Sequence, residues 1–170
     1  IPCNLPRSCS ENKTIQIGYH GNKVHILSMV PRITNAFKLL SREHRIKLKL
    51  IYDVEKLGRI KSGLPSELEI EYVQWSESAM NNDLANCDIA IIPNTIPMSK
   101  PRGSLSPSPT LFLEDPEDYV LKFKYLTNPG RIITCGMMGL PVVADIFPSS
   151  LNVIDHGVDG YVAHNTGAWY

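Results

Sequence analysis

Residues 127–163, TNPGRIITCGMMGLPVVADIFPSSLNVIDHGVDGYVA, contain a short helix, a glycine break, a buried strand, a second helix and a turn bounded by glycines. Asn128 is a residue type that favours the N-cap of a helix, and Pro129 suits the first helical position, where no amide hydrogen is needed. Gly139 can adopt the left-handed conformation that ends a helix, so the apolar segment 140–144 is predicted to be a strand. The stretch therefore predicts a helix–strand–helix unit.

Arg131 is an unusual residue for the first turn of that predicted helix. The positive end of the helix dipole repels a cation there by about 0.3–1 kcal/mol. The placement makes sense if an anion such as phosphate lies between the guanidinium group and the helix amides, which Gly130 keeps accessible. The alternative is an ordinary capped helix whose arginine points to solvent.

The rest of the chain alternates between predicted strands and predicted helices. This order predicts an α/β fold, a doubly wound parallel sheet with helices on both faces, over residues 14–170. Pro31 is expected to interrupt the first helix, so that its first turn forms either a separate piece or a kinked entry. The predicted strands are 14–19, 46–52, 68–73, 88–92 and 140–144, and the predicted helices are 22–43, 54–60 and 76–86.

Two segments fall outside this alternation. Residues 1–13 are rich in Pro, Ser and Asn and are predicted to form a linker or leader. Residues 94–118 hold five prolines with serines between them, which predicts little regular structure. Because this second segment follows the fourth strand, its base is expected near the ligand-binding edge of the sheet, although a tolerated surface insertion is the alternative.

A glycine-rich turn follows the first predicted strand. Ligands of doubly wound sheets bind beyond the carboxyl ends of the strands, and Gly18-x-x-Gly21 lies at such an end. The glycines could let the backbone approach a diphosphate, although a plain strand-to-helix turn is the alternative. His20, between them, could donate a hydrogen bond to phosphate or to a sugar hydroxyl, or could simply be solvated.

Four segments of the chain together resemble a known domain: GLPVVA at 139–144, DHGVDGYV at 155–162, IQIGYHG at 15–21 and NCDIAIIP at 86–93. They are similar to the donor-binding, C-terminal domain of GT-B glycosyltransferases, most of all the retaining enzymes of glycosyltransferase family four and the related group-one transferases. The resemblance implies the Rossmann-like half of a GT-B fold. It also implies transfer of a sugar from a nucleoside-diphosphate sugar to an unknown acceptor.

The resemblance also implies residue roles. Many members carry two glutamates, at positions that here are Leu126 and Thr134, whereas a subset has an N-x-R sequence that Asn128-Pro129-Gly130-Arg131 resembles. Thr134 could bond a ribose hydroxyl, or a backbone carbonyl one turn earlier. The implied donor and phosphate ligands are Gly18, His20, Gly21, Asn128, Gly130, Arg131 and Thr134. Gln74 and Trp75 are the implied nucleobase contacts, although Trp75 could instead cap the core.

Composition bounds the remaining possibilities. The chain has 170 residues, of which 43% are hydrophobic, and its 17 basic residues balance 17 acidic ones, so nothing favours nucleic acid as a partner. No apolar run is long enough for a transmembrane segment. No Cys/His spacing suggests a metal site, and no cofactor is expected. Cys87 and Cys135 are predicted to be buried free thiols, and a cytoplasmic location is expected.

A domain of this kind needs an acceptor domain or protein, and none is expected within this chain. We therefore expect a domain that is truncated at its C-terminus and unable to catalyse transfer alone. A non-catalytic sugar-nucleotide or partner-binding module is the alternative that the missing glutamates favour. A nicotinamide-dependent oxidoreductase is disfavoured, because no G-x-G-x-x-G follows the first strand.

Overall fold

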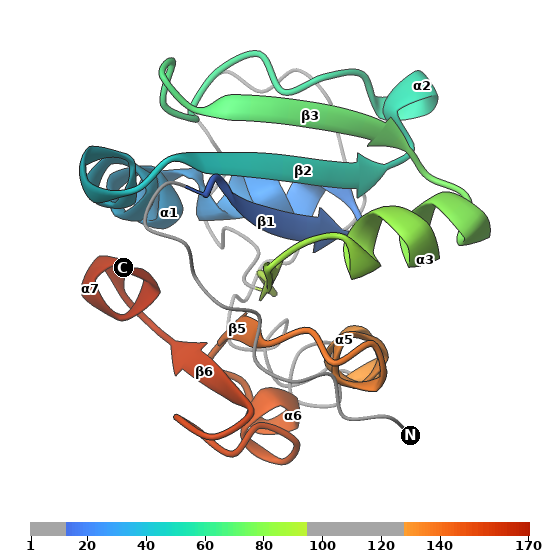
Figure 1. Cartoon of the computed structure of the whole chain (residues 1–170), viewed down its shortest axis with the longest axis vertical. Coiled ribbons are helices and arrows are strands. Elements are labelled where there is room, and N and C mark those ends of the chain that lie inside the picture. The colour runs from blue at the N-terminus through green and yellow to red at the C-terminus, as the bar shows by residue number, and fades with distance from the viewer. Residues whose placement is uncertain (1–12, 95–127) are drawn as a thin grey trace, which may run out of the picture.

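The computed structural model describes residues 13–94 and 128–170 (Figure 1). Segments 1–12 and 95–127 lie outside the described residues, and with them nearly all of the predicted linker and of the proline-rich segment 94–118. The strands are β1 (Ile15–His20), β2 (Ile46–Tyr52), β3 (Glu69–Gln74), β4 (Ile89–Ile92), β5 (Val142–Asp145) and β6 (Gly160–Ala163). The helices are α1 (Lys23–Glu43), α2 (Val54–Leu57), α3 (Glu77–Ala85), α5 (Gly130–Met137), α6 (Pro148–Leu151) and α7 (Thr166–Trp169).

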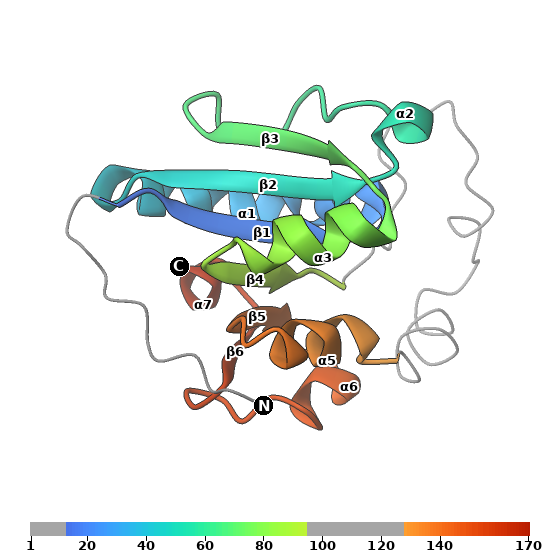
Figure 2. The ribbon, with the colours of Figure 1, turned by 45° about the vertical axis from the view of Figure 1, so that its right-hand side comes forward.

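The six strands form one parallel sheet in the order β3-β2-β1-β4-β5-β6. The chain runs outward from β1 to β3, then crosses back to β4 and runs outward to β6. Helix α1 consequently covers one face of the sheet, and α3 and α5 cover the other (Figures 1 and 2). The predicted doubly wound α/β fold is confirmed, as is the parallel pairing of β4 with β5 through Ala90 and Val142.

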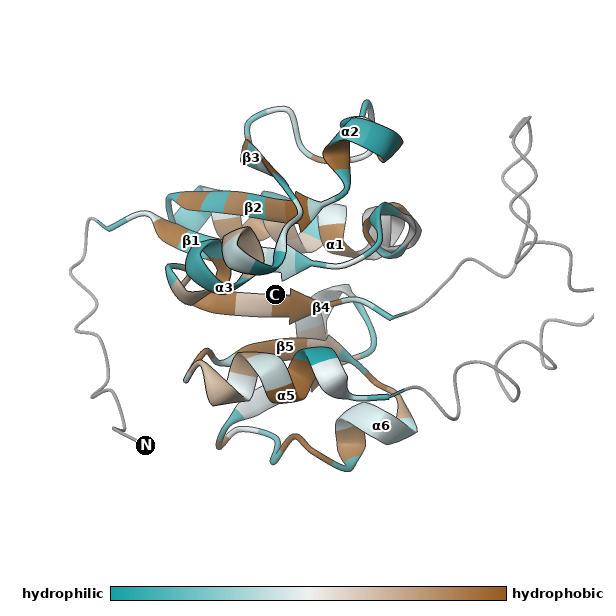
Figure 3. Cartoon of the chain, turned by 90° about the vertical axis from the view of Figure 1, so that its right-hand side faces the viewer, coloured by the Kyte–Doolittle hydropathy of each residue, from teal (hydrophilic) through white to brown (hydrophobic). Residues whose placement is uncertain are grey.

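The core consists of two apolar clusters, one on each face of the sheet. Successive side chains of a strand point to opposite faces, and in β2 Leu50 joins the cluster under α1 while Ile51 joins the cluster under α3 and α5. Figure 3 shows β4 and β5 as mostly hydrophobic, as expected for strands covered on both faces. Cys87 and Cys135 are buried free thiols in the second cluster, as predicted.

Helices α1 and α2 differ from their predicted extents. Helix α1 is assigned continuously from Lys23 to Glu43, so Pro31 does not divide it. Helix α2 is shorter than the predicted 54–60, because Gly58 leaves the helical conformation at φ 66°. The Lys23 ammonium donates to the carbonyls of Leu57, Gly58 and Arg59 at 2.7, 2.9 and 3.0 Å, which satisfies the end of α2 and ties it to the start of α1.

Candidate functional site

Helix α5 begins one residue later than the sequence predicts. Pro129, not Asn128, is the N-cap, because its carbonyl accepts the first helical hydrogen bonds, from the amides of Ile132 and Ile133. Asn128 still contributes to the helix start, since its Oδ1 accepts the Gly130 amide at 2.8 Å. The other end is as predicted, because Gly139, at φ 68°, terminates α5. The Gly139 amide donates to the Gly136 carbonyl and the Leu140 amide donates to the Cys135 carbonyl, which is the hydrogen-bond pattern of a helix that ends at a left-handed glycine.

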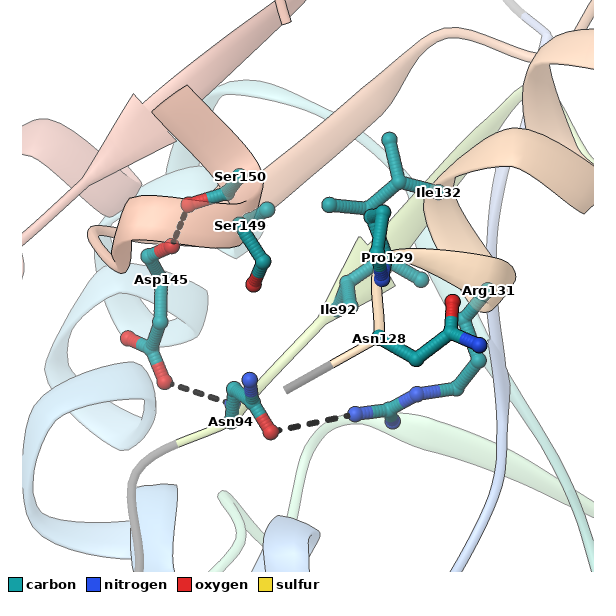
Figure 4. Close-up of a pocket in the computed structure, with 10 residues that line it drawn as sticks. Ile92, Asn94, Asn128, Pro129, Arg131, Ile132, Asp145, Ser149 and Ser150 are labelled. Atoms are coloured by element: carbon teal, nitrogen blue, oxygen red, sulfur yellow. Dashed lines mark hydrogen bonds between the residues drawn. The ribbon is translucent and has the colours of Figure 1, made fainter. Parts of the chain in front are cut away.

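Arg131 points into the molecule and does not simply extend into solvent. Its Nη2 donates to the Pro93 carbonyl at 3.2 Å, with a longer contact of 3.5 Å to Asn94 Oδ1 (Figure 4). Its Nη1 is buried and has no hydrogen-bond acceptor among residues 13–94 and 128–170, although Arg131 lies close enough to the Tyr19 hydroxyl to lower the pKa of that group. An unpaired buried donor costs about 1–3 kcal/mol, so a guanidinium group held in this way points to a ligand that supplies the missing acceptor.

The loop after β1 lies directly against this guanidinium group. Gly21 has φ 140°, and a Cβ atom built on it would come within 2.8 Å of Tyr19 Oη and 3.0 Å of Arg131 Nη1. Tyr19 is fully buried and donates its hydroxyl proton to the Asn22 carbonyl at 2.7 Å. Burial raises the pKa of Tyr19 above its ordinary value, although Arg131 partly opposes this. Gly21 therefore allows the close approach of α5 to the β1 loop.

His20 ends β1 next to this contact. Its Nε2 is buried and has no hydrogen-bond partner among the residues that the structure describes. Burial lowers the pKa of His20, and the positive charge of Arg131 lowers it further. The imidazole is therefore held neutral beside a guanidinium group, where one ring nitrogen can donate a hydrogen bond to an anion.

The lowered pKa of His20 predicts how stability depends on pH without ligand. The unfolded chain binds a proton at His20 near pH 6.5, whereas the folded protein resists it until a lower pH, so stability falls as the pH drops below about 6.5. His20→Asn removes this group. Urea unfolding at pH 7.5 and 5.5 should show a larger loss for the wild type than for His20→Asn, and equal losses would contradict the environment described for His20.

Gly18 has a different role from the one predicted. It lies inside β1 and not in the turn, paired with Lys49 of β2 and Ala90 of β4. A Cβ atom on Gly18 would come within 2.7 Å of Cys87 Sγ and 2.8 Å of Leu84 Cδ1. Its missing side chain therefore lets the end of α3 and the turn before β4 pack on β1, so Gly18 is not part of the site.

Gly18→Ala should destabilise the protein by about 1–3 kcal/mol through overpacking against Leu84 and Cys87. It should leave the affinity of the folded protein for any ligand at the Arg131 guanidinium unchanged. Denaturant unfolding combined with a ligand titration checks both expectations, and a loss of affinity at full folding would return Gly18 to the site.

The predicted base-contacting residues lie at the end of β3. The side chain of Trp75 is 50% exposed, so it does not cap the core. Gln74 helps to hold α2, because its Oε1 accepts the Glu55 amide at 2.9 Å and its Nε2 donates to Asp53 Oδ1 at 3.3 Å. Trp75 is thus available for a ligand, whereas Gln74 is engaged in the loop.

Thr134 lies one turn after Arg131 on α5 and is partly buried. Its hydroxyl makes no hydrogen bond to the described residues, so the alternative bond to a backbone carbonyl one turn earlier is not formed there. The Gly130 amide was predicted to bind the ligand, but it already donates to Asn128 Oδ1. The Nδ2 group of Asn128 is therefore the donor that remains for a ligand at this position.

A small polar pocket extends from Arg131 along the ends of β4 and β5 (Figure 4). Tyr19, Asn94 and Asp145 lie at or just beyond the ends of predicted strands, where ligands are expected, but sequence reasoning gave them no role, and it missed Ser149. The pocket lies between the starts of α5 and α6. Its lining residues are Ile92, Asn94, Asn128, Pro129, Arg131, Ile132, Ala144, Asp145, Ser149 and Ser150.

Residues 13–94 and 128–170 contain neither a candidate metal-binding cluster nor a candidate membrane-spanning helix. No cluster of three or more His, Cys, Asp or Glu side chains there could hold a metal ion. No helix in the same residues has the length and apolar character needed to cross a membrane.

Comparison with known proteins identifies the fold. No model of a known protein family matches the chain, and no curated protein sequence matches it. Anabaena Alr3699/HepE, solved in complex with UDP and glucose, has a TM-score of 0.52 at 13% identity over 92% of this chain and 36% of that chain. The lipopolysaccharide outer core galactosyltransferase WaaB, in its apo form, has a TM-score of 0.52 at 12% identity over 94% of this chain and 38% of that chain.

The chain therefore spans little more than a third of either of these proteins. The identities are too low to carry residue roles across. The parallel sheet, its strand order and the two structures together establish that this chain has the Rossmann-like fold found in GT-B glycosyltransferases.

Proposed function

We propose that this chain is the donor-binding, C-terminal domain of a glycosyltransferase that uses a nucleoside-diphosphate sugar. The observation that carries the proposal is a pair of buried polar atoms, Arg131 Nη1 and His20 Nε2, on two segments that meet at Gly21. Neither atom has a hydrogen-bond partner within the part of the chain that the structure describes. They lie where β1 and β4 are neighbours and the chain changes direction across the sheet. Ligands of doubly wound sheets bind at that point, and diphosphate oxygens would satisfy both atoms.

The chemistry follows from the charges at this edge. When the bond between the sugar and the diphosphate breaks, negative charge grows on the leaving oxygens. The guanidinium group of Arg131 and the positive end of α5 are fixed in place before the reaction, so they stabilise that charge without reorganising. His20 donates as a neutral imidazole, and Asn128 donates through Nδ2 because its Oδ1 is occupied by the Gly130 amide.

The nucleoside would extend from the diphosphate toward Trp75 and Thr134. Trp75 is half exposed at the end of β3 and presents an aromatic face on which a base can stack. The Thr134 hydroxyl is the candidate for a ribose contact on the same helix as Arg131. HepE was solved with UDP and glucose, which makes UDP the first nucleotide to test.

The acceptor would come from a second domain or protein, because the chain spans only 36% of HepE and 38% of WaaB. The buried free thiols Cys87 and Cys135 support a reducing, cytoplasmic location. A non-catalytic sugar-nucleotide module is the second candidate, favoured by Leu126 and Thr134 at positions where many glycosyltransferases carry glutamates. A sugar-transfer assay on the full-length protein separates the two.

Titration with UDP, followed by tryptophan fluorescence, tests donor binding. The chain has two tryptophans, and Trp169 is 6% exposed, so quenching by a stacked base should come from Trp75. We expect UDP to quench the emission and the variant Trp75→Phe to lose that response while still binding. Inorganic pyrophosphate, which has no base, should bind more weakly and leave the emission unchanged.

NAD serves as the competing ligand in this titration, because it separates a donor domain from a nicotinamide-dependent oxidoreductase. NAD should bind more weakly than UDP. Tighter binding of NAD than of UDP, or no saturable response to any nucleoside diphosphate, would contradict the proposed function.

A further inference from the structure

We propose that Asp145 is a positioning residue that holds Arg131 in place through a single peptide group of the chain. This inference rests on the proposed function, because it assigns a role within the same diphosphate site. It concerns the peptide that joins Pro93 to Asn94, immediately after β4.

The Pro93–Asn94 peptide is bound on both sides. Its N–H donates to Asp145 Oδ2 at 2.7 Å, and its carbonyl oxygen accepts from Arg131 Nη2 at 3.2 Å. None of the described peptide bonds is cis, so the N–H and the C=O of this peptide point in opposite directions. Asp145 and Arg131 therefore lie on opposite sides of it, as a carboxylate–peptide–guanidinium series. Figure 4 shows Asp145 and Arg131 on opposite sides of Asn94.

Asp145 itself is firmly placed at the end of β5. The residue is 3% exposed, and its backbone carbonyl accepts the buried Ser150 hydroxyl at 2.7 Å. Its neighbour Ala144 pairs with Ile92 of β4, so β5 and β4 bring the carboxylate and the Pro93–Asn94 peptide together. These contacts fix the backbone of Asp145 independently of the Pro93–Asn94 peptide, so the carboxylate is held where it can set the position of that peptide.

The series has an electrostatic consequence. A carboxylate that accepts a hydrogen bond from a peptide N–H polarises that peptide group, which makes the carbonyl oxygen on its other side a stronger hydrogen-bond acceptor. That carbonyl accepts from Nη2 of the Arg131 guanidinium group, which leaves Nη1 as the nitrogen available to donate to the ligand. The Asn94 side chain is secondary in this account, because its contact with Arg131 measures 3.5 Å.

A double-mutant cycle with inorganic pyrophosphate as the probe tests this inference. Asp145→Asn keeps the shape of the side chain and removes its charge, and it should weaken pyrophosphate binding by about five- to tenfold. In the Arg131→Ala background the same change should have less than about a twofold effect, because no guanidinium group remains to be positioned. Asn94→Ala, which keeps the peptide, should change the affinity by less than about threefold.

The matched control is Asp88→Asn at the opposite, amino-terminal edge of the sheet. The Asp88 carboxylate also accepts a backbone N–H, from Gln16 at 2.9 Å. Asp88→Asn therefore changes a carboxylate–amide hydrogen bond of the same type, but at a strand end away from the site. Its pyrophosphate affinity should equal that of the wild type. Thermal unfolding confirms that each variant is folded; if Asp145→Asn is not, Asp145→Glu, which displaces the carboxylate by one methylene, takes its place in the same cycle.

The outcomes separate this inference from the function on which it rests. Equal losses from the Asp145 change with and without Arg131 would overturn the positioning role while leaving the phosphate site intact. An unchanged affinity in Asp145→Asn would overturn it as well. If Arg131→Ala alone leaves pyrophosphate binding unchanged, the proposed function itself fails.

Discussion

Arg131→Ala is expected to weaken the binding of a nucleoside diphosphate by roughly ten- to a hundredfold. A hydrogen bond to a charged group contributes about 1.5–3 kcal/mol, and about 1.4 kcal/mol corresponds to a factor of ten in affinity. The fold should survive, because within the described residues the change removes one bond to the Pro93 carbonyl, a longer contact to Asn94 and a buried Nη1 that has no partner there. Calorimetric titration with UDP measures the effect.

Arg42→Ala is the control for this variant. Arg42 is an exposed arginine in the last turn of α1, so the same change of side chain is made far from the carboxyl ends of the strands. Its affinity for UDP should match that of the wild type. If Arg131→Ala and Arg42→Ala bind UDP equally well while both remain folded, Arg131 does not contact the diphosphate.

Gly21→Ala is expected to damage both the stability and the site. A left-handed or extended positive-φ conformation costs a non-glycine residue about 1–3 kcal/mol, and the new methyl group would collide with Tyr19 Oη and crowd Arg131 Nη1. The free energy of unfolding should fall by at least that amount. The affinity for UDP should fall about tenfold or more, because Arg131 must move away.

Two further variants separate backbone strain from collision. Gly157→Ala introduces a side chain at φ 85° with nothing within 4 Å, so it should lower stability by strain alone and leave UDP binding unchanged. Gly21→Ala combined with Tyr19→Phe removes the atom nearest the new methyl group and should recover part of the stability but not the affinity. Full recovery of affinity in this double variant would show that Arg131 was not displaced.

Much of the fold is predictable because short segments of the sequence carry the signals for its strands and helix ends. The short, almost wholly apolar runs of β4 and β5 are typical of parallel strands that are covered on both faces, and the turn residues around them mark the helix ends. Strand pairing then follows from the alternation of strands and helices. Two helix ends were wrong: Gly58 ended α2 earlier than predicted, and Pro129 displaced Asn128 as the N-cap, because backbone hydrogen bonds set these ends. The interruption at Pro31 was also wrong, and β6 and α7 were not predicted.

The site was predictable only in part, because its residues are separated along the chain. Arg131 conflicted with its own helix dipole, and that local conflict was visible in the sequence. The contact of Arg131 with Gly21 and the engagement of Asp145 with the Asn94 amide depend on strands that are distant in sequence, so no pattern could reveal them. For the same reason Gly18 was assigned to the ligand, although its space is occupied by Leu84 and Cys87.

The most direct test of the central claim is a crystal structure of this chain with UDP bound. We expect the diphosphate at the carboxyl ends of β1 and β4, with a phosphate oxygen within hydrogen-bonding distance of Arg131 Nη1 and another within reach of His20 Nε2. A structure in which UDP binds elsewhere, with both of these atoms still unpaired, would contradict the assignment of this edge of the sheet as the donor site.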